Sequence, residues 1–220
     1  RKIDIDRPWR WLTLGWQDFR RVPVVGSCYG AIFVAAGFAL AAVVWVTDLL
    51  YLLLPMMAAF MLLGPLVALG LYSVSRRLER EPADDGPRLL FWSFAAWRAN
   101  PQQVALMGLI LVLICLIWLR IAAVLFALFY TVAPPTLEDL VLVTLFETRG
   151  FLFLVVGTAV GAVLALIVYS IGVISFPMLL DRQVNVVTAM ATSVLAIKHN
   201  RQAMILWAAL IVIFTGVGLA

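Results

Sequence analysis

The sequence is poor in the residues that most often hold metals and cofactors. It has one histidine, His199, and two cysteines, Cys28 and Cys115, in 220 residues. One histidine cannot supply a bis-histidine haem, and the cysteines show no metal-ligand spacing. No P-loop, nucleophile elbow or zinc-protease motif is present either. We therefore expect no cofactor, no metal site and no catalytic residue.

Charge is also scarce. Asp, Glu, Lys and Arg make up 13% of the residues, against about 25% in an average soluble domain. Hydrophobic residues make up 65%, and the mean hydropathy is +1.06. The chain holds long uncharged runs, and roughly 20 apolar residues in a helix span the hydrocarbon of a bilayer. This pattern predicts an all-α, polytopic transmembrane helix bundle that forms one integral membrane domain over residues 1–220.

Five membrane spans follow from these runs. They are expected at about residues 24–46, 51–74, 103–119, 151–175 and 203–220. The sequence begins with Arg1 instead of Met, and it stops inside an apolar run at Ala220. We therefore expect a fragment of a longer chain, with a sixth span after Ala220.

The basic residues indicate the orientation in the membrane. Of the sixteen Lys and Arg residues, six lie in residues 1–21, five in 76–102 and three in 181–202. These three segments lie on one side under the span assignment, and cytoplasmic loops carry the excess of Lys and Arg. We predict a bacterial inner-membrane protein with a cytoplasmic N-terminus. The net charge of +4 is then a topology signal, and no nucleic-acid partner is expected.

Residues 1–21 have the pattern of an interfacial amphipathic helix. Asp6 is placed to cap it, and Pro8 suits its first turn. Its two faces differ in chemistry: the apolar face carries Trp9, Leu12, Trp16 and Phe19, and the polar face carries Arg10, Thr13, Gln17 and Arg20. Such a helix lies flat on an anionic leaflet. It serves either as an anchor alone or as a lipid-sensing element.

An internal repeat appears when the chain is shifted by 100 residues. The segment "SFAAWRANPQQVALMGLILVL" (93–113) then aligns with "SVLAIKHNRQAMILWAALIVI" (193–213), and a fainter copy lies at 15–34. Each copy reads as a surface helix, a basic elbow and a span. Asn100 and Asn200 are expected to cap the entering helices. His199 aligns with Ala99, so we interpret it as part of an interfacial elbow; a proton-sensing or ligand role is the alternative.

Five cations are candidates for contact with anionic lipid headgroups. Four lie at the elbows and one at the far end of the third span: Arg20, Arg21, Arg98, Lys198 and Arg120. Arg120 follows a run that already crosses most of the hydrocarbon core, so it is expected to reach the far headgroups. It alternatively pairs with an acid, or acts as a buried functional arginine; the candidate acids are Asp48, Glu138, Asp139 and Glu147.

Residues 121–148 are expected to form a helical hairpin in the outer leaflet. The prolines at 134 and 135 divide two apolar arms, and Thr136 with Asp139 forms a capping pair. Each arm is too short to span the bilayer alone. A transporter reading would place a substrate site in such proline-broken segments.

Small residues at helical spacing mark two packing faces. One holds Gly26 and Gly30, and the other holds Gly157, Gly161 and Ala165. Small residues let helix backbones approach closely, either within the chain or against a partner's helix. Cys28 and Cys115 lie at different depths of their spans, roughly 10 Å apart at about 1.5 Å per residue. We expect them to be buried small residues without a disulfide.

The chain resembles a family of uncharacterised bacterial integral membrane proteins, which sometimes carry the label cytochrome c oxidase subunit I. The resemblance rests on "WLTLGWQDFRRVP" (11–23), "LLGPLVALGLYSVSRRLE" (62–79) and "SFPMLLDRQVNVVTAMATSVLAIKHN" (175–200), within which residues 177–182 are the most specific. It implies a further span and no established activity. Catalytic oxidase subunits need several intramembrane histidines, and this chain has none.

These observations favour a non-catalytic protein. The leading hypothesis is an accessory or scaffolding subunit that packs against other membrane protein subunits, for example in a respiratory or other energy-transducing complex. The rival is a small-solute or lipid transporter, suggested by the repeat and the proline-broken hairpin. An enzyme acting on lipid headgroups at the elbows is a third hypothesis.

Overall fold

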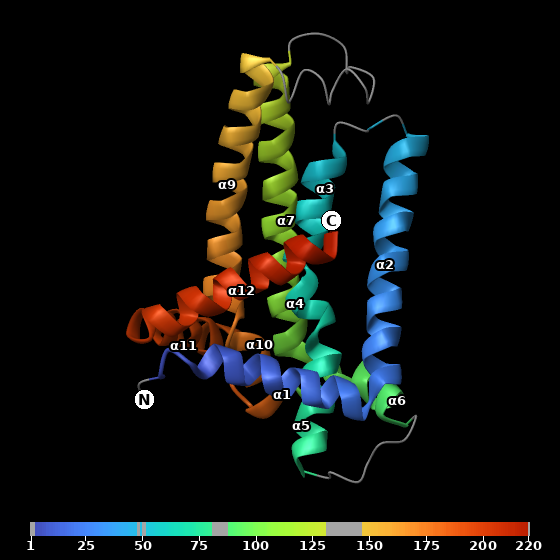
Figure 1. Ribbon diagram of the computed structural model, residues 1–220, viewed down its shortest axis with the longest axis vertical. Coiled ribbons are helices and arrows are strands. Elements are labelled where there is room, and N and C mark those ends of the chain that lie inside the picture. Colours follow the sequence, from blue (N-terminus) through green and yellow to red (C-terminus); the bar gives the residue numbers. More distant parts are fainter. Residues whose placement is uncertain (1–2, 48, 50–51, 81–87, 131–146, 220) are drawn as a thin grey trace. The chain divides into compact units, whose positions relative to one another are not determined.

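The computed structural model describes residues 3–47, 49, 52–80, 88–130 and 147–219, and every regular element in these ranges is a helix (Figure 1). The elements are α1 (Arg7–Arg21), α2 (Pro23–Val46), α3 (Leu53–Leu62), α4 (Gly64–Val67), α5 (Leu69–Arg80), α6 (Arg88–Phe94), the 3-10 helix η2 (Ala96–Ala99), α7 (Pro101–Phe129), α9 (Thr148–Gly172), α10 (Ser175–Asp181), α11 (Val186–His199) and α12 (Arg201–Leu219). The predicted all-α polytopic fold class is confirmed.

The long helices match the uncharged runs of the sequence. Within the described residues, α2, α7, α9 with α10, and α12 are long and apolar enough to cross a membrane, and α3 with α4 and α5 makes a fifth span if the bent pair counts as one. Five of them, α2, α3, α7, α9 and α12, are apolar on all sides, which a helix tolerates only inside lipid or protein. Helix α5 differs, because its last turns carry three arginines and a glutamate. A helix inside lipid also satisfies its own backbone groups, because lipid offers no hydrogen bonds.

The second predicted span is a broken helix. Its axis turns by 42° between Leu53–Leu62 and Gly64–Arg80. The cause is Pro65, which has no N–H and whose ring clashes with the carbonyl four residues earlier. The Leu63 N–H accordingly bonds to the carbonyl of Phe60, three residues back, at 3.2 Å.

The hairpin prediction for residues 121–148 is wrong in its first arm. Residues 121–129 continue α7 without a break, so this helix has 29 residues and a length of about 43 Å at 1.5 Å per residue. No glycine or proline interrupts this stretch, and the first breaker is Pro134. The second arm and its capping pair, Thr136 with Asp139, lie outside the described residues.

The chain divides into two compact units. Unit 1 comprises Arg1–Cys28, Ala68–Ala105 and Tyr169–Ala220, and unit 2 comprises Tyr29–Val67 and Leu106–Val168. Unit 1 therefore collects the surface helices and elbows, and unit 2 collects the middle portions of the long helices.

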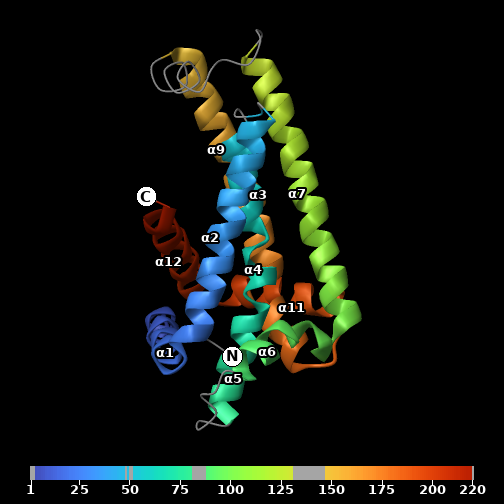
Figure 2. The ribbon, with the colours of Figure 1, turned by 90° about the vertical axis from the view of Figure 1, so that its right-hand side faces the viewer.

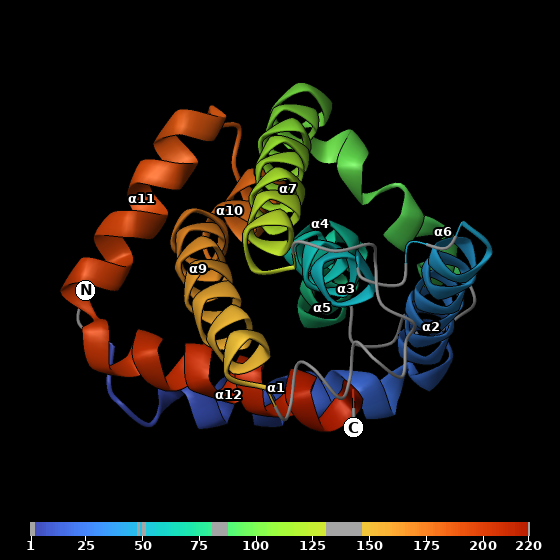
Figure 3. The same ribbon diagram turned by 90° about the horizontal axis from the view of Figure 1, so that it is seen from above.

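Unit 2 is a row of helices in the order α2, α3, α7 and α9, seen nearly end-on from above (Figure 3). Phe33 of α2 packs on Phe60 of α3 with ring centroids 4.5 Å apart. Further along the row, α7 and α9 are neighbours (Figures 1 and 3), and Phe153 of α9 packs against Tyr130 with ring centroids 5.3 Å apart. Figure 2 shows the same helices from the side.

Two side chains of α7 tie it to α3. The indole N–H of Trp118 donates to the Pro55 carbonyl at 2.8 Å, and the Cys115 thiol donates to the Ala59 carbonyl at 3.3 Å. In an unbroken helix the Leu63 N–H would donate to the Ala59 carbonyl. Because the break at Leu63 removes that hydrogen bond, the Ala59 carbonyl is left to accept from the Cys115 thiol. Cys115 and Cys28 are both free thiols; Cys115 is buried as expected, whereas Cys28 is only half-buried.

Unit 1 is organised around α5 and α10, which contact each other. Seen from above, α1, α6 and α11 lie on three sides of this pair (Figure 3). Side chains at the centre are fully buried, including Leu78 and Leu89 at 1% and 0% exposure. On the outer side, Trp11 of α1 meets Trp207 of α12 edge-on, with ring centroids 5.4 Å apart.

Helix α1 forms where the interfacial helix is predicted, with Pro8 in its first turn; its place at the membrane interface remains a prediction. The capping prediction is wrong: Asp6 occupies the N-cap position, but its side chain makes no capping hydrogen bond. Trp9 and Trp16 on the predicted apolar face are 53% and 60% exposed. These two rings are therefore largely open to lipid, whereas Phe19 of the same face lies against Gly26.

Candidate functional site

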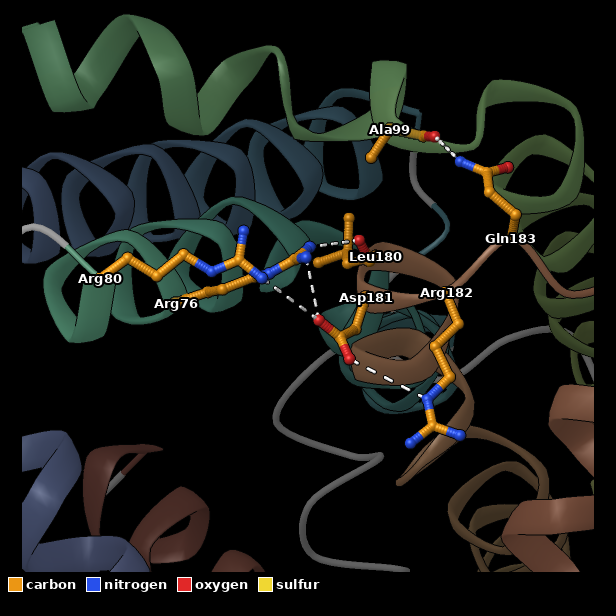
Figure 4. Close-up of polar contacts among 7 residues, drawn as sticks. All are labelled: Arg76, Arg80, Ala99, Leu180, Asp181, Arg182 and Gln183. Atoms are coloured by element: carbon orange, nitrogen blue, oxygen red, sulfur yellow. Dashed lines mark hydrogen bonds and ion pairs between the residues drawn. The ribbon is translucent and has the colours of Figure 1, made fainter.

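A cluster of polar contacts in unit 1 joins the end of α5 to the end of α10 (Figure 4). A guanidinium nitrogen of Arg76 lies 2.9 Å from a carboxylate oxygen of Asp181. The other terminal nitrogen of Arg76 donates to the Leu180 carbonyl at 2.5 Å. A cation at the last carbonyls of a helix satisfies groups that have no partner inside the helix and complements the helix dipole. Arg76 thus fixes the C-terminus of α10 against α5.

Two more arginines surround the same carboxylate. Arg80 approaches Asp181 at 3.9 Å and Arg182 at 4.0 Å. Their side chains are 66% and 70% exposed, so each of these pairs contributes little to stability in water. Arg76 is the dominant partner, because its side chain is only 33% exposed and it makes two charge-assisted contacts.

The linker between α10 and α11 is hydrogen-bonded to residues 99–103, where η2 leads into α7. The Gln183 amide donates to the Ala99 carbonyl at 2.9 Å (Figure 4). The Asn100 amide donates to the Val184 carbonyl at 3.2 Å, and the Val186 N–H donates to the Gln103 side chain at 2.8 Å. These three hydrogen bonds fix the linker and the first residue of α11 against the segment that begins α7.

Asn200, between α11 and α12, forms a hydrogen bond with the N-terminal segment. The Asn200 side-chain oxygen accepts the Ile3 N–H at 2.7 Å, and its amide donates to the Ala196 carbonyl at 2.9 Å. The predicted capping role of the elbow asparagines is therefore wrong. Their backbone carbonyls accept the first bonds of α7 and α12 from Val104 and Met204, whereas the side chains bond to other segments.

His199 lies at the end of α11, exposed to the surroundings. Its Nδ1 lies 2.7 Å from the Leu195 carbonyl, one turn earlier on the same helix. This position matches the elbow interpretation. Its proton-sensing and ligand alternatives remain predictions.

Five polar residues are buried among the described residues: Ser93, Asn100, Ser175, Ser193 and Asn200. The 100-residue shift relates Ser93 to Ser193, and it relates Asn100 to Asn200. The Ser193 hydroxyl, at 0% exposure, accepts the Ile174 N–H at 3.3 Å. Buried polar groups need such partners, because an unsatisfied one costs about 1–3 kcal/mol.

The predicted headgroup cations are all exposed. Four lie at helix ends in unit 1: Arg20 and Arg21 in the last turn of α1, Arg98 in η2 and Lys198 in α11. Arg120 lies on α7 within unit 2 and is also exposed. Three of its possible acidic partners, Asp48, Glu138 and Asp139, lie outside the described residues. Lipid contact by these five cations remains a prediction.

The predicted packing glycines fall into two groups. A side chain at Gly26 would collide with the Phe19 ring, and one at Gly161 would lie 3.2 Å from the Trp118 ring. These two positions serve packing within the chain. In contrast, a Cβ at Gly30 or Gly157 would meet no atom within 4 Å.

The sequence does not predict the Arg76–Asp181 pair, nor the hydrogen bonds of Gln103 and Gln183 that fix the α10–α11 linker. The available signal is indirect: Asp181 lies within the most specific stretch of the family resemblance, residues 177–182, directly after a predicted span. The partners lie 84 to 104 residues apart in the chain for the bonds from Gln183 and Arg76. Helical periodicity carries no information about contacts at that separation.

Within the described residues, no three His, Cys, Asp or Glu side chains gather closely enough to hold a metal ion. Comparison with curated proteins and with solved structures finds no match. Residues 53–181, well over half of the chain, match the family described as predicted integral membrane protein (DUF2189). These residues include the broken helix, α7, α9 and the Arg76–Asp181 junction. The chain belongs to this family of integral membrane proteins, and its apolar helices lie in contact with the lipid bilayer.

Proposed function

We propose that this protein is a non-catalytic accessory or scaffolding subunit that packs against other membrane proteins in the bacterial inner membrane. A respiratory or other energy-transducing complex is the setting we infer for it. The observation that carries the proposal is the small-residue face of α9, on which Gly157 has open space beside it and Ala165 is exposed.

Among the described residues, the two glycines of this face differ in what lies against them. Gly161 lies against Trp118, whereas Gly157, one turn earlier, has open space where a side chain would stand. Ala165, one turn later, is exposed. Only 6% of the apolar window of α9 is buried. Small residues allow the close backbone approach on which helix association in membranes depends, so the open positions suit a helix from another subunit.

Helix α2 supports the same reading. Gly26 is covered by Phe19, but Gly30 is open. The two helices thus share one arrangement, in which one glycine packs internally and its neighbour one turn away does not. A chain that only needed internal packing would have no use for the second glycine at each site.

The orientation in the membrane belongs to the same proposal. The cations at the ends of α1, η2 and α11, namely Arg20, Arg21, Arg98 and Lys198, are exposed. We place them at the anionic headgroups of the cytoplasmic leaflet, with the N-terminus in the cytoplasm. Each lies in a last helical turn, where a cation is favoured by the helix dipole.

The test compares two substitutions on the small face with one on another face of α9. Gly157→Leu and Ala165→Leu fill the open face, and Ala159→Leu adds bulk about 200° round the helix from Gly157, at roughly 100° per residue. Each variant is purified in mild detergent after cross-linking in membranes, and the bound proteins are identified by mass spectrometry. The wild type and Ala159→Leu should retain the same membrane proteins, and the two face variants should lose them. Equal retention by all variants, or no bound protein at all, would contradict the proposal.

A small-solute or lipid transporter is the second candidate. The observation that favours it is the break at Leu63, because discontinuous membrane helices often form substrate sites. The measurement is the reactivity of Leu63→Cys with a membrane-impermeant thiol reagent, after Cys28 and Cys115 are replaced by serine. Leu109→Cys, on the exposed side of α7, is the lipid-facing control. Reactivity no higher than that control would remove the transporter candidate.

We also infer that the internal repeat is a structural duplication. In its support, η2 and α11 each end at an elbow, at Asn100 and Asn200, that leads into a long helix. The aligned serines, Ser93 and Ser193, are 2% and 0% exposed. The matching replacements Ser93→Val and Ser193→Val should therefore destabilise the protein to similar extents in a detergent unfolding assay. A large difference between them would argue against duplication.

A further inference from the structure

We propose that the segment formed by α6 and η2 inserts an aromatic face into the anionic leaflet of the membrane, with Arg98 at the lipid phosphates. This inference does not depend on the accessory role, since lipid reaches the segment whether or not α9 binds a partner.

The segment is apolar on two opposite sides. Its inner side carries Leu89, Ser93 and Ala96, which are 0%, 2% and 8% exposed and face the contacts of this segment with α5 and α10. Its outer side carries large aromatic rings that remain exposed: Phe91, Trp92, Phe94 and Trp97, at 78%, 57%, 50% and 51%. A surface helix of a water-soluble protein would be polar on this outer side.

Water is a poor environment for this aromatic face. Phenylalanine and tryptophan bury about 150–250 Å² each when they are covered, and contiguous exposed apolar patches mark membrane or protein interaction sites. The position in the chain favours the membrane, because η2 leads through Asn100 directly into α7, a candidate span that begins at Pro101. Trp97 therefore lies four residues before a membrane helix, at the depth where tryptophan is enriched.

Charge distinguishes the leaflet from other occupants. The Arg98 guanidinium lies over the Trp97 ring at 5.7 Å, and the Arg77 guanidinium lies over the Trp92 ring at 4.9 Å. Each exposed indole thus has a cation beside it, and Arg88 at the start of α6 is also exposed. Aromatic rings in the acyl boundary with arginines at the phosphates match an anionic lipid surface. The acidic residues at 81, 84 and 85 lie outside the described residues.

Site-directed spin labels measure this directly in the full chain reconstituted into vesicles of phosphatidylcholine and phosphatidylglycerol. In a background with Cys28 and Cys115 replaced by serine, labels are attached at Phe91→Cys and, separately, at Trp97→Cys. Glu79→Cys on α5 is the exposed polar control. Phe91 is largely exposed, so its replacement should leave the fold intact, and circular dichroism verifies this for each variant.

Collision rates with oxygen, which concentrates in lipid, and with a water-soluble nickel chelate then locate each label. The labels at 91 and 97 should show a nickel-to-oxygen ratio several-fold below that of the control. A ratio equal to the control would place the face in water and overturn the proposal. Protection from both reagents would mean that protein covers the face, which would also overturn it.

The anionic preference is tested with Arg98→Gln, and Arg80→Gln is the matched control on the Asp181 cluster. Association of spin-labelled phosphatidylglycerol, relative to phosphatidylcholine, should fall several-fold in Arg98→Gln and stay unchanged in Arg80→Gln. An unchanged preference in Arg98→Gln would refute the role of Arg98 at the phosphates.

Discussion

The packing of α9 on α7 depends on Trp118, and this contact yields a quantitative prediction. The Trp118 side chain is 6% exposed, donates to the Pro55 carbonyl and lies against Gly161. It therefore connects three helices of unit 2. Replacing it in steps separates the hydrogen bond from the packing.

Trp118→Phe removes the indole N–H and keeps an aromatic ring. A hydrogen bond between membrane helices is worth about 0.6 kcal/mol on average and about 1.7 kcal/mol at most, so the loss should lie in that range. Trp118→Ala also removes the ring and leaves a cavity, which costs about 3–5 kcal/mol. Gly161→Leu forces a side chain to within 3.2 Å of the ring, and overpacking of this kind costs about 1–3 kcal/mol.

The two positions should be coupled. In the double variant Trp118→Ala with Gly161→Leu, the leucine occupies space that the indole has left, so the two costs should not add. A coupling free energy of about 0.5–3 kcal/mol is expected for residues in contact. Gly157→Leu is the control, because a Cβ at this position meets no atom within 4 Å; its effect should stay within about 0.5 kcal/mol.

The assay is reversible unfolding in mixed micelles, with increasing denaturing detergent and helix content followed by circular dichroism. The free energy of unfolding of each variant gives the coupling from the cycle. Strictly additive costs for Trp118→Ala and Gly161→Leu would show that these side chains do not touch, and the packing of α9 on α7 described above would then be refuted.

Three further predictions concern unit 1. Arg76→Gln should lower the free energy of unfolding by roughly 1–2 kcal/mol, because the variant loses the ion pair with Asp181 and the hydrogen bond to the C-terminus of α10. Arg80, 3.9 Å from Asp181, is the control, and Arg80→Gln should change that free energy by less than about 0.5 kcal/mol. Equal effects of the two replacements in the same assay would contradict the dominance of Arg76. Asn200→Ala should speed hydrogen exchange at the Ile3 amide, since that N–H loses its acceptor, and exchange at the wild-type rate would count against this bond. Ser193→Val should cost about 1–3 kcal/mol by leaving a buried N–H without a partner, and a neutral result would show that water or another group replaces the hydroxyl.

The sequence predicted the elements with strong local signals. The interfacial helix α1 combines Pro8 in its first turn with a period of three to four residues in its aromatic face. Helices α2 and α12 match the bounds of their predicted spans to within about two residues, because their apolar runs begin after Pro23 and Arg201 and that of α2 is followed by Thr47 and Asp48. Those signals come from a residue's own chemistry and its near neighbours.

Predictions failed where local signals were ambiguous. Residues 121–129 are apolar and short, which suited a hairpin arm as well as the end of α7. The span predicted at residues 51–74 is present as a bent pair of helices, and only its bend, which Gly64 and Pro65 mark in the sequence, is not predicted. Asn100 and Asn200 have the composition of caps, but their side chains bond to segments that arrive from elsewhere in the chain.

The sequence by itself determined that this is a polytopic helical membrane protein, because the transfer of apolar helices into lipid depends only on composition and length. Only the tertiary structure decided that Arg76 meets Asp181, that Gly161 is covered by Trp118 and that Gly157 is left open. The local sequence does not distinguish the two glycines, because each follows a valine and precedes a small residue. Which one receives an internal partner depends on where α7 passes along α9, and that is set by the packing of whole helices.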